Sequence, residues 1–305
     1  YYNLTGNFSK FNNSINKLIY ERIDSNCKTL ANKEDIIPSD YDYIYGISGG
    51  VKYLLDIDYL DETNSKNIVK YFLYLTEDRF VDNFKTPIFY LSNKGNMQYK
   101  DYYPDNYIDI GFAHGIASIL LILVELSKRI NSSKLIESIK KILSIYDMFH
   151  TEDKYITYPD ILSLKDYFSK NVCLNNNYYT WCYGSISILR SLIEAYSTLK
   201  DNDKLCFYKE KYNQIIYSKN IDINLTSPCY CHGFAGLIDA QVYHYKENNN
   251  PELLQNIQKN IMQMLRKYQI NNDFYQQNPN IFSDVTKLYM IEGYKNDYSI
   301  LSGVG

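Results

Sequence analysis

The feature that most constrains the fold of this chain is a short glycine pattern that recurs along its whole length. The pattern is Gly-x-x-Gly or Gly-x-x-Ser, and each copy runs into an apolar segment. Copies begin at Gly6, Gly46, Gly115, Gly184 and Gly233, and a sixth begins at Gly303. The segments that follow carry apolar side chains at helical spacing, as in residues 116–126. Each interval has room for two helices, which predicts a series of helical hairpins.

The segments between the glycine-led helices are amphipathic, and their polar faces suit an outer layer. They include residues 68–75, 135–148 and 253–268. Alternating inner and outer helices can form an open solenoid or close into a ring. A ring is favoured because His and Cys residues occupy the equivalent point of several repeats, and a ring brings these points together at one end of a central cavity. We therefore predict an all-α chain folded as one α/α toroid domain over residues 1–305.

Residues 87–103 depart from the helical pattern. An apolar run at 88–91 is followed by Asn93-Lys94-Gly95-Asn96 and then by Met97-Gln98-Tyr99. Two short apolar runs around a glycine-containing turn are typical of a β-hairpin. We expect this segment to form a hairpin or long loop over the mouth of the ring.

Charge and hydropathy exclude several classes of protein. The formal net charge is only -3, so bulk charge does not indicate a nucleic-acid partner. No apolar run approaches the roughly 20 residues that a membrane-spanning helix needs. Six cysteines are unevenly spaced in a chain whose core is large enough to need no disulfides, which favours a reducing, cytoplasmic setting with thiols free for metal. The chain starts at Tyr1 without an initiator methionine or signal sequence, so we expect an N-terminal portion to precede it.

Two distant elements supply a set of metal ligands. Trp181-Cys182-Tyr183-Gly184 contains one cysteine, and Cys231-His232-Gly233 contains a cysteine and a histidine. Three such ligands leave a tetrahedral zinc ion with one open position, which is the arrangement of catalytic sites, whereas a structural site more usually has four. The simpler alternative is that these cysteines are small buried apolar side chains. Cys229 is an alternative ligand, although we expect it to be a loop or core residue.

These elements, taken together with two others, resemble the signature of the LanC lanthipeptide cyclases. The others are Gly111-Phe112-Ala113-His114-Gly115, with Tyr103-Pro104 ahead of it, and the segment from Tyr41 to Gly49, which carries Asp42-x-x-x-Gly46-x-x-Gly49. The resemblance covers essentially the whole chain. It implies an α/α toroid with one zinc ion at the end of the ring. It also implies that an N-terminal portion with the first repeat and a short piece after Gly305 are missing.

The resemblance further implies the reaction and the residues that carry it. A cysteine of a dehydrated precursor peptide would add to dehydroalanine or dehydrobutyrine in the same peptide, forming the (methyl)lanthionine thioether rings of a lantibiotic. Cys182, Cys231 and His232 would hold the zinc ion. His114 would be the general acid that protonates the enolate. Asp42 would orient or charge His114, or accept the thiol proton, and Tyr183 would hydrogen-bond to the enolate oxygen or to the bound sulfur.

Each of these assignments has a local alternative, and the chain departs from the family at two positions. Without the resemblance, Asp42 is better explained as an ordinary N-cap or turn residue before the Gly46 helix. His114 can be a packing histidine, and Tyr183 is one of 34 tyrosines. Tyr178 stands where the family commonly has Arg, which puts a charge role there in doubt. Ser118 replaces a common glycine, a conservative change.

Several functions remain open at this level. The chain can be the cyclase domain of a bifunctional lanthipeptide synthetase, or a non-catalytic zinc- or peptide-binding protein of the same fold. An α/α-toroid glycosidase would need two carboxylates across the cavity, which the metal ligands do not predict. As partners the resemblance implies the precursor peptide, and a dehydratase and an export transporter at the inner face of the cell membrane.

Overall fold

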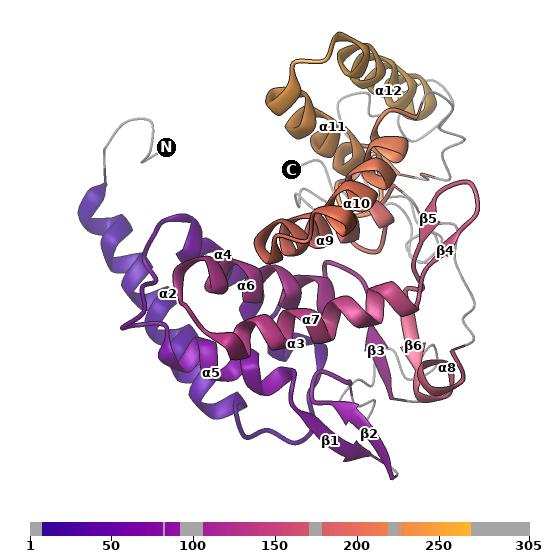
Figure 1. Cartoon of the computed structure of the whole chain (residues 1–305). Helices are drawn as coiled ribbons and strands as arrows, with labels where there is room; N and C mark the ends of the chain where they lie inside the picture. The colour runs from indigo at the N-terminus through magenta and orange to yellow at the C-terminus, as the bar shows by residue number, and fades with distance from the viewer. Residues whose placement is uncertain are drawn as a thin grey trace, which may run out of the picture. The chain divides into compact units, whose positions relative to one another are not determined.

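The computed structural model describes residues 8–81, 83–91, 106–170, 179–218, 225 and 227–269. In these ranges the chain is mainly helical, with eleven helices and six short strands (Figure 1). None of these helices is both long enough and apolar enough to cross a bilayer. The predicted predominance of helix is therefore confirmed, whereas closure into a toroid and the single domain over 1–305 stay predictions.

The chain divides into two compact units. The first contains residues Tyr1–Phe149, Pro159–Cys173 and Glu194–Lys200, and the second contains His150–Tyr158, Leu174–Ile193 and Asp201–Gly305.

The first unit is built around a glycine-led helix, α6 (Ile116–Arg129). Nine of its side chains are buried, and they lie on all sides of the helix, which is typical of a core helix. Three helices pack against α6: α4 (Ile47–Asp56), α5 (Lys66–Leu75) and α7 (Ser133–Met148). A long helix, α2 (Ser9–Leu30), packs on α4 and α5. The glycine-led segments thus supply core helices, as the repeat predicted.

The first unit also contains two short helices and two antiparallel strand pairs. The helices are α3 (Pro38–Tyr41) and α8 (Leu164–Ser169). Strand β1 (Asp78–Val81) pairs with β2 (Phe84–Pro87), and β3 (Tyr107–Asp109) pairs with β6 (Ile161–Ser163). The hairpin predicted at 87–103 lies mostly outside the described residues. Its described start, 88–91, forms a turn after β2, and Leu91 makes an isolated bridge to Tyr107.

The second unit contains a small strand pair and the remaining helices. Strand β4 (Thr151–Glu152) pairs with β5 (Ile156–Thr157). The helices are α9 (Ser185–Leu199), whose last residues belong to the first unit, α10 (Asn202–Ile216), α11 (Phe234–Asn248) and α12 (Pro251–Gln269). The Gln241 side chain joins α11 to its neighbours, because it donates to the Ile216 carbonyl and accepts from the Asn260 amide.

The recurring glycines stand directly before helices α4, α6, α9 and α11. At Gly46, Gly115, Gly184 and Gly233 the chain folds back so tightly that an added Cβ atom would overlap backbone atoms of the preceding turn. Overlap with backbone cannot be relieved by a side-chain rotation, so only glycine fits at these four positions. The repeat seen in the sequence is therefore a repeat of one tight turn that delivers the chain into a core helix.

Candidate functional site

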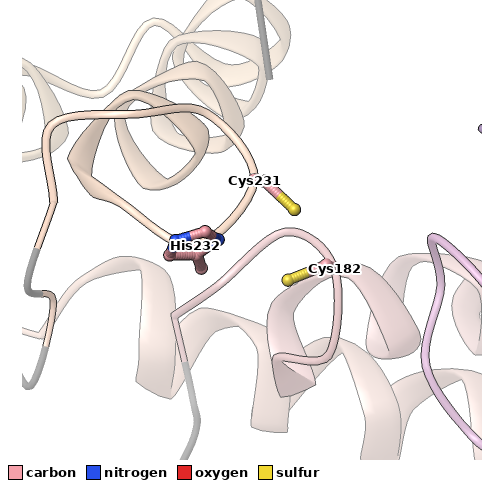
Figure 2. Close-up of side chains that lie close together, drawn as sticks. All are labelled: Cys182, Cys231 and His232. Carbon is pink, nitrogen blue, oxygen red and sulfur yellow. The ribbon is translucent and has the colours of Figure 1, made fainter. Parts of the chain in front are cut away.

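Three predicted ligand side chains converge in the second unit. Cys182 lies in the turn before α9, and Cys231 and His232 lie in the turn before α11. Figure 2 shows the two sulfur atoms and the imidazole ring pointing toward one another. The ligand atoms all lie within 4.8 Å of one another, and no other such group of His, Cys, Asp or Glu occurs among the described residues.

Backbone hydrogen bonds bring the two turns together. The N–H of Cys182 donates to the carbonyl of Cys231 at 3.0 Å, which joins the two ligand-bearing segments directly. In the first turn the N–H of Gly184 donates to the carbonyl of Thr180 at 2.9 Å. In the second the N–H of Phe234 donates to the carbonyl of Ser227 at 3.0 Å. Main-chain hydrogen bonds thus help to position the three ligand residues.

The donor set suits zinc. Two thiols and one imidazole are borderline-soft ligands of the kind that zinc accepts, and three of them leave a fourth position open. In a tetrahedral zinc site with Zn–S bonds of 2.3 Å, neighbouring ligand atoms are about 3.8 Å apart. A group already within 4.8 Å needs only a small contraction to reach that geometry. The structure thus supports a metal site here.

The protonation of Cys182 follows from its surroundings. A hydrogen bond with Cys231 and the burial of its sulfur raise the pKa of the Cys182 thiol well above its ordinary value, and His232 opposes this effect. The thiol is therefore protonated at neutral pH without a metal. Because only the thiolate is a good ligand, a cation that binds here must displace this proton.

The other cysteines among the described residues lie outside this group. Cys229 is buried two residues before Cys231, and its backbone N–H donates to Ser227 Oγ at 3.1 Å. Cys27 is buried on α2, and Cys206 is exposed on α10. Cys229 therefore does not join the metal group in this arrangement. Cys173 and Tyr178 lie outside the described residues.

His114 and Asp42 form a pair in the first unit. Nδ1 of His114 lies 3.0 Å from Oδ2 of Asp42, whose side chain is only 1% exposed, whereas the His114 side chain is 29% exposed. The other oxygen of Asp42 accepts the backbone N–H groups of Tyr45 and Gly46, at 2.5 and 2.7 Å. Asp42 thus accepts hydrogen bonds in the turn before α4 and also contacts His114, while its role toward His114 in catalysis stays a prediction.

The two turns that carry this pair are joined by the main chain as well. The backbone N–H of Tyr43 donates to the carbonyl of Ala113 at 2.9 Å. The ring of Tyr45 is stacked on the imidazole of His114, with centroids 5.9 Å apart and planes 12° from parallel. Tyr45 could not be singled out from the sequence, where its only signal is its place directly before Gly46. The two predicted clusters thus fall in different units, with the pair in the first and the metal ligands in the second.

Tyr183 and Ser118 lie close in sequence to the recurring glycines Gly184 and Gly115. Tyr183 is half-buried in the same turn as Cys182. Ser118 is fully buried on α6, and its hydroxyl donates to the carbonyl of Gly115 at 2.8 Å. A small side chain is thus retained at the start of that core helix. The other two histidines lie outside the metal group and the His114–Asp42 pair. His150 follows α7 and contacts Tyr158, and His244, on α11, contacts Tyr212 and Tyr217.

Comparison with known proteins identifies the family. The family model described as "Lanthionine synthetase C-like protein" matches residues 1–288. The chain belongs to this family. The resemblance to LanC found in the sequence is thereby confirmed.

One curated relative and one solved structure illustrate the relationship. The LanC-like chain is 30% identical over 215 residues to "Nisin biosynthesis protein NisC" of Lactococcus lactis subsp. lactis. The matched region covers 68% of the chain and 50% of that protein. It matches the solved structure "Nisin cyclase" with a TM-score of 0.69 and 23% identity, covering 85% of the chain and 66% of that structure. The chain therefore shares the nisin cyclase fold and spans about half the length of the curated relative.

Proposed function

We propose that this LanC-like protein is a zinc-dependent lanthipeptide cyclase that forms thioether rings in a dehydrated precursor peptide. The observation that carries the proposal is the convergence of Cys182, Cys231 and His232, whose donor atoms lie within 4.8 Å of one another. The relationship to NisC, a protein of nisin biosynthesis, supports a peptide substrate of this chemical class. The substrate would be met in a reducing cytoplasm, where its cysteines remain thiols.

The reaction joins a cysteine sulfur to the β-carbon of a dehydro residue. The thiol loses its proton, the C–S bond forms as the carbon–carbon π bond opens, and the resulting enolate takes a proton at the α-carbon. Zinc bound by the three ligands would lower the pKa of the substrate thiol and orient its sulfur. As thiolates, Cys182 and Cys231 would reduce the charge of the metal, which would keep the substrate sulfur nucleophilic.

His114 supplies the proton to the α-carbon in this proposal. Its Nδ1 atom faces the buried carboxylate of Asp42, so the proton for the substrate would come from Nε2. A carboxylate at 3.0 Å favours the protonated imidazole, the form that can donate from Nε2. Asp42 thus acts through His114 by setting the orientation and charge of the ring. Tyr183, next to Cys182, would donate to the enolate oxygen.

The test is cyclisation of a dehydrated lanthipeptide precursor by the purified, zinc-loaded protein. Cyclisation does not change the mass, so rings are counted by the loss of free thiols that an alkylating reagent can label, read by mass spectrometry. Wild-type protein is expected to remove thiols far faster than the spontaneous addition. Cys231→Ala is expected to lose both zinc and activity, and His114→Ala to keep zinc and lose turnover.

The matched control is His150→Ala, which removes a histidine outside both clusters and is expected to behave as wild type. A wild-type protein that binds zinc but leaves the spontaneous rate unchanged would identify a non-catalytic zinc- or peptide-binding protein. Normal rate and stereochemistry in His114→Ala would remove the general-acid role while leaving the metal role intact. A dehydratase and an export transporter are the further partners to test, by co-purification.

A further inference from the structure

An aromatic pair bridges the two turns that carry the metal ligands. Trp181 directly precedes Cys182, and Tyr230 directly precedes Cys231. Their ring centroids are 5.5 Å apart and their planes are inclined at 58°. Each ring therefore belongs to the residue next to one cysteine ligand, and it contacts the ring next to the other cysteine ligand.

Helix α11 holds this pair from the other side. The hydroxyl of Tyr230 donates to Oδ2 of Asp239 on α11 at 2.8 Å, so the far end of the ring is attached to the helix that follows its own turn. A Cβ atom added at Gly236 would lie 3.1 Å from Cβ of Trp181 and would overlap the carbonyl oxygen of Tyr230. The first turns of α11 thus lie against both residues of the pair.

We propose that Tyr230 and Asp239 are positioning residues of the metal centre. The hydrogen bond between them fixes the Tyr230 ring against Trp181, and the aromatic pair holds the two ligand turns at the separation that zinc requires. The pair adds a side-chain contact to the backbone hydrogen bond from Cys182 to Cys231, so that the two turns are joined at two points. This inference rests on the proposed zinc site, and it assigns a role to two residues outside the metal group.

The Tyr230–Asp239 hydrogen bond and the Trp181–Tyr230 ring contact together form a clamp on the two ligand turns. We expect this clamp to slow the release of the metal. Zinc leaves when one ligand turn swings away from the other, so weakening the clamp accelerates release even where the folded state is unchanged. Groups that orient metal ligands from outside the coordination shell commonly change metal affinity by about 10- to 100-fold. The Tyr230–Asp239 bond is exposed and does not contact a ligand directly, so we expect about a three- to tenfold effect.

The experiment measures zinc release from the full chain to an excess of a chromophoric chelator. Tyr230→Phe keeps the ring and removes the hydroxyl, and Asp239→Ala removes the acceptor. Each is expected to release zinc about three- to tenfold faster than wild type, and the double variant no faster than either single one, because both remove the same bond. Tyr230→Leu removes the ring contact as well and is expected to release zinc more than about tenfold faster.

The control is Tyr217→Phe, which removes another hydroxyl in the same unit. Tyr217 Oη accepts from the Asn250 amide at 3.3 Å and takes no part in the metal group. This variant is expected to release zinc at the wild-type rate. Thermal unfolding of the metal-free proteins separates positioning from stability, because Tyr230→Phe and Tyr217→Phe should lower the midpoint by similar small amounts.

The outcomes separate this inference from the function on which it rests. A wild-type chain that takes up no zinc overturns both. A wild-type chain that binds one zinc ion and a Tyr230→Phe variant that releases it at the same rate overturn the positioning role alone. Independent, multiplying effects of Tyr230→Phe and Asp239→Ala also overturn it, because residues that act through one shared bond cannot be additive.

Discussion

The carboxylate of Asp42, almost fully buried, lies 3.0 Å from Nδ1 of His114 and at the same time accepts two backbone N–H groups from its own turn. The two oxygens of one side chain therefore serve different purposes. Oδ1 stabilises the turn that leads into α4, and Oδ2 faces the imidazole. The turn thus holds the carboxylate in place for His114.

Asp42→Asn is expected to separate these two purposes. The amide oxygen can still accept the N–H groups of Tyr45 and Gly46, whereas the negative charge that favours protonated His114 is lost. We expect zinc content to be unchanged and ring formation to slow by about 10- to 100-fold, part of the contribution of a general acid. The measurements are elemental analysis and the thiol-labelling assay. Loss of zinc in Asp42→Asn would contradict this separation of roles.

Gly184→Ala is expected to disrupt the metal group from within the backbone. An added methyl group would overlap the backbone of Thr180, so the turn before α9 must open and displace Cys182. We expect zinc binding to be lost and unfolding to become easier by more than about 2 kcal/mol. The control is Gly50→Ala, where the methyl group meets only side-chain atoms of Ile23, which can move. Equal zinc content in both variants would show that the tight turn is not required.

Zinc affinity is expected to fall as the pH is lowered. The pKa of Cys182 is raised by Cys231 and by burial, so its thiol is protonated throughout the range below that pKa. Every proton that zinc must displace weakens binding about tenfold for each unit by which the pH falls. Competition titrations at pH 6, 7 and 8, together with calorimetry in buffers of different ionisation enthalpy, measure the protons released. An affinity independent of pH would contradict displacement of a thiol proton.

Zinc is expected to protect Cys231 from alkylation. Cys231 is half-buried, and its sulfur joins the metal group, whereas Cys206 is exposed on α10 and lies outside that group. In metal-free protein iodoacetamide should therefore label both cysteines, and in zinc-loaded protein it should label Cys206 but not Cys231. Peptide mapping by mass spectrometry reads both sites in one sample, so Cys206 is an internal control. Equal labelling of Cys231 in the two states would place the metal elsewhere.

The metal group was predictable because its members stand next to each other or next to a repeated glycine. Cys231 and His232 are adjacent, and Cys182 occupies the same place in its own repeat. The structure brings the three together, as a shared ion requires, while their role as ligands stays a prediction. The glycine-led core helices were predictable for the same reason, since a periodic apolar pattern records burial directly.

Other contacts left no readable pattern in the sequence. Tyr45 stacks on His114 and Tyr230 bonds to Asp239, but a chain with 34 tyrosines offers no means of choosing these two. The strand pair of β3 with β6 joins segments of three residues that lie far apart in the chain, too short to show an alternating pattern. Such contacts depend on where the helices place their connecting turns, which is a property of the packed structure.

The four tight turns before α4, α6, α9 and α11 present different side chains from the same kind of backbone turn. Counting back from each glycine, the first residue is Tyr45, His114, Tyr183 or His232, and Cys182 and Cys231 both occupy the second place. One kind of turn thus presents His114, the proposed proton donor, in one copy and the proposed metal ligands in two others. New chemistry in such a protein needs only a change of side chain in a turn that already exists, with no change to the main chain that supports it.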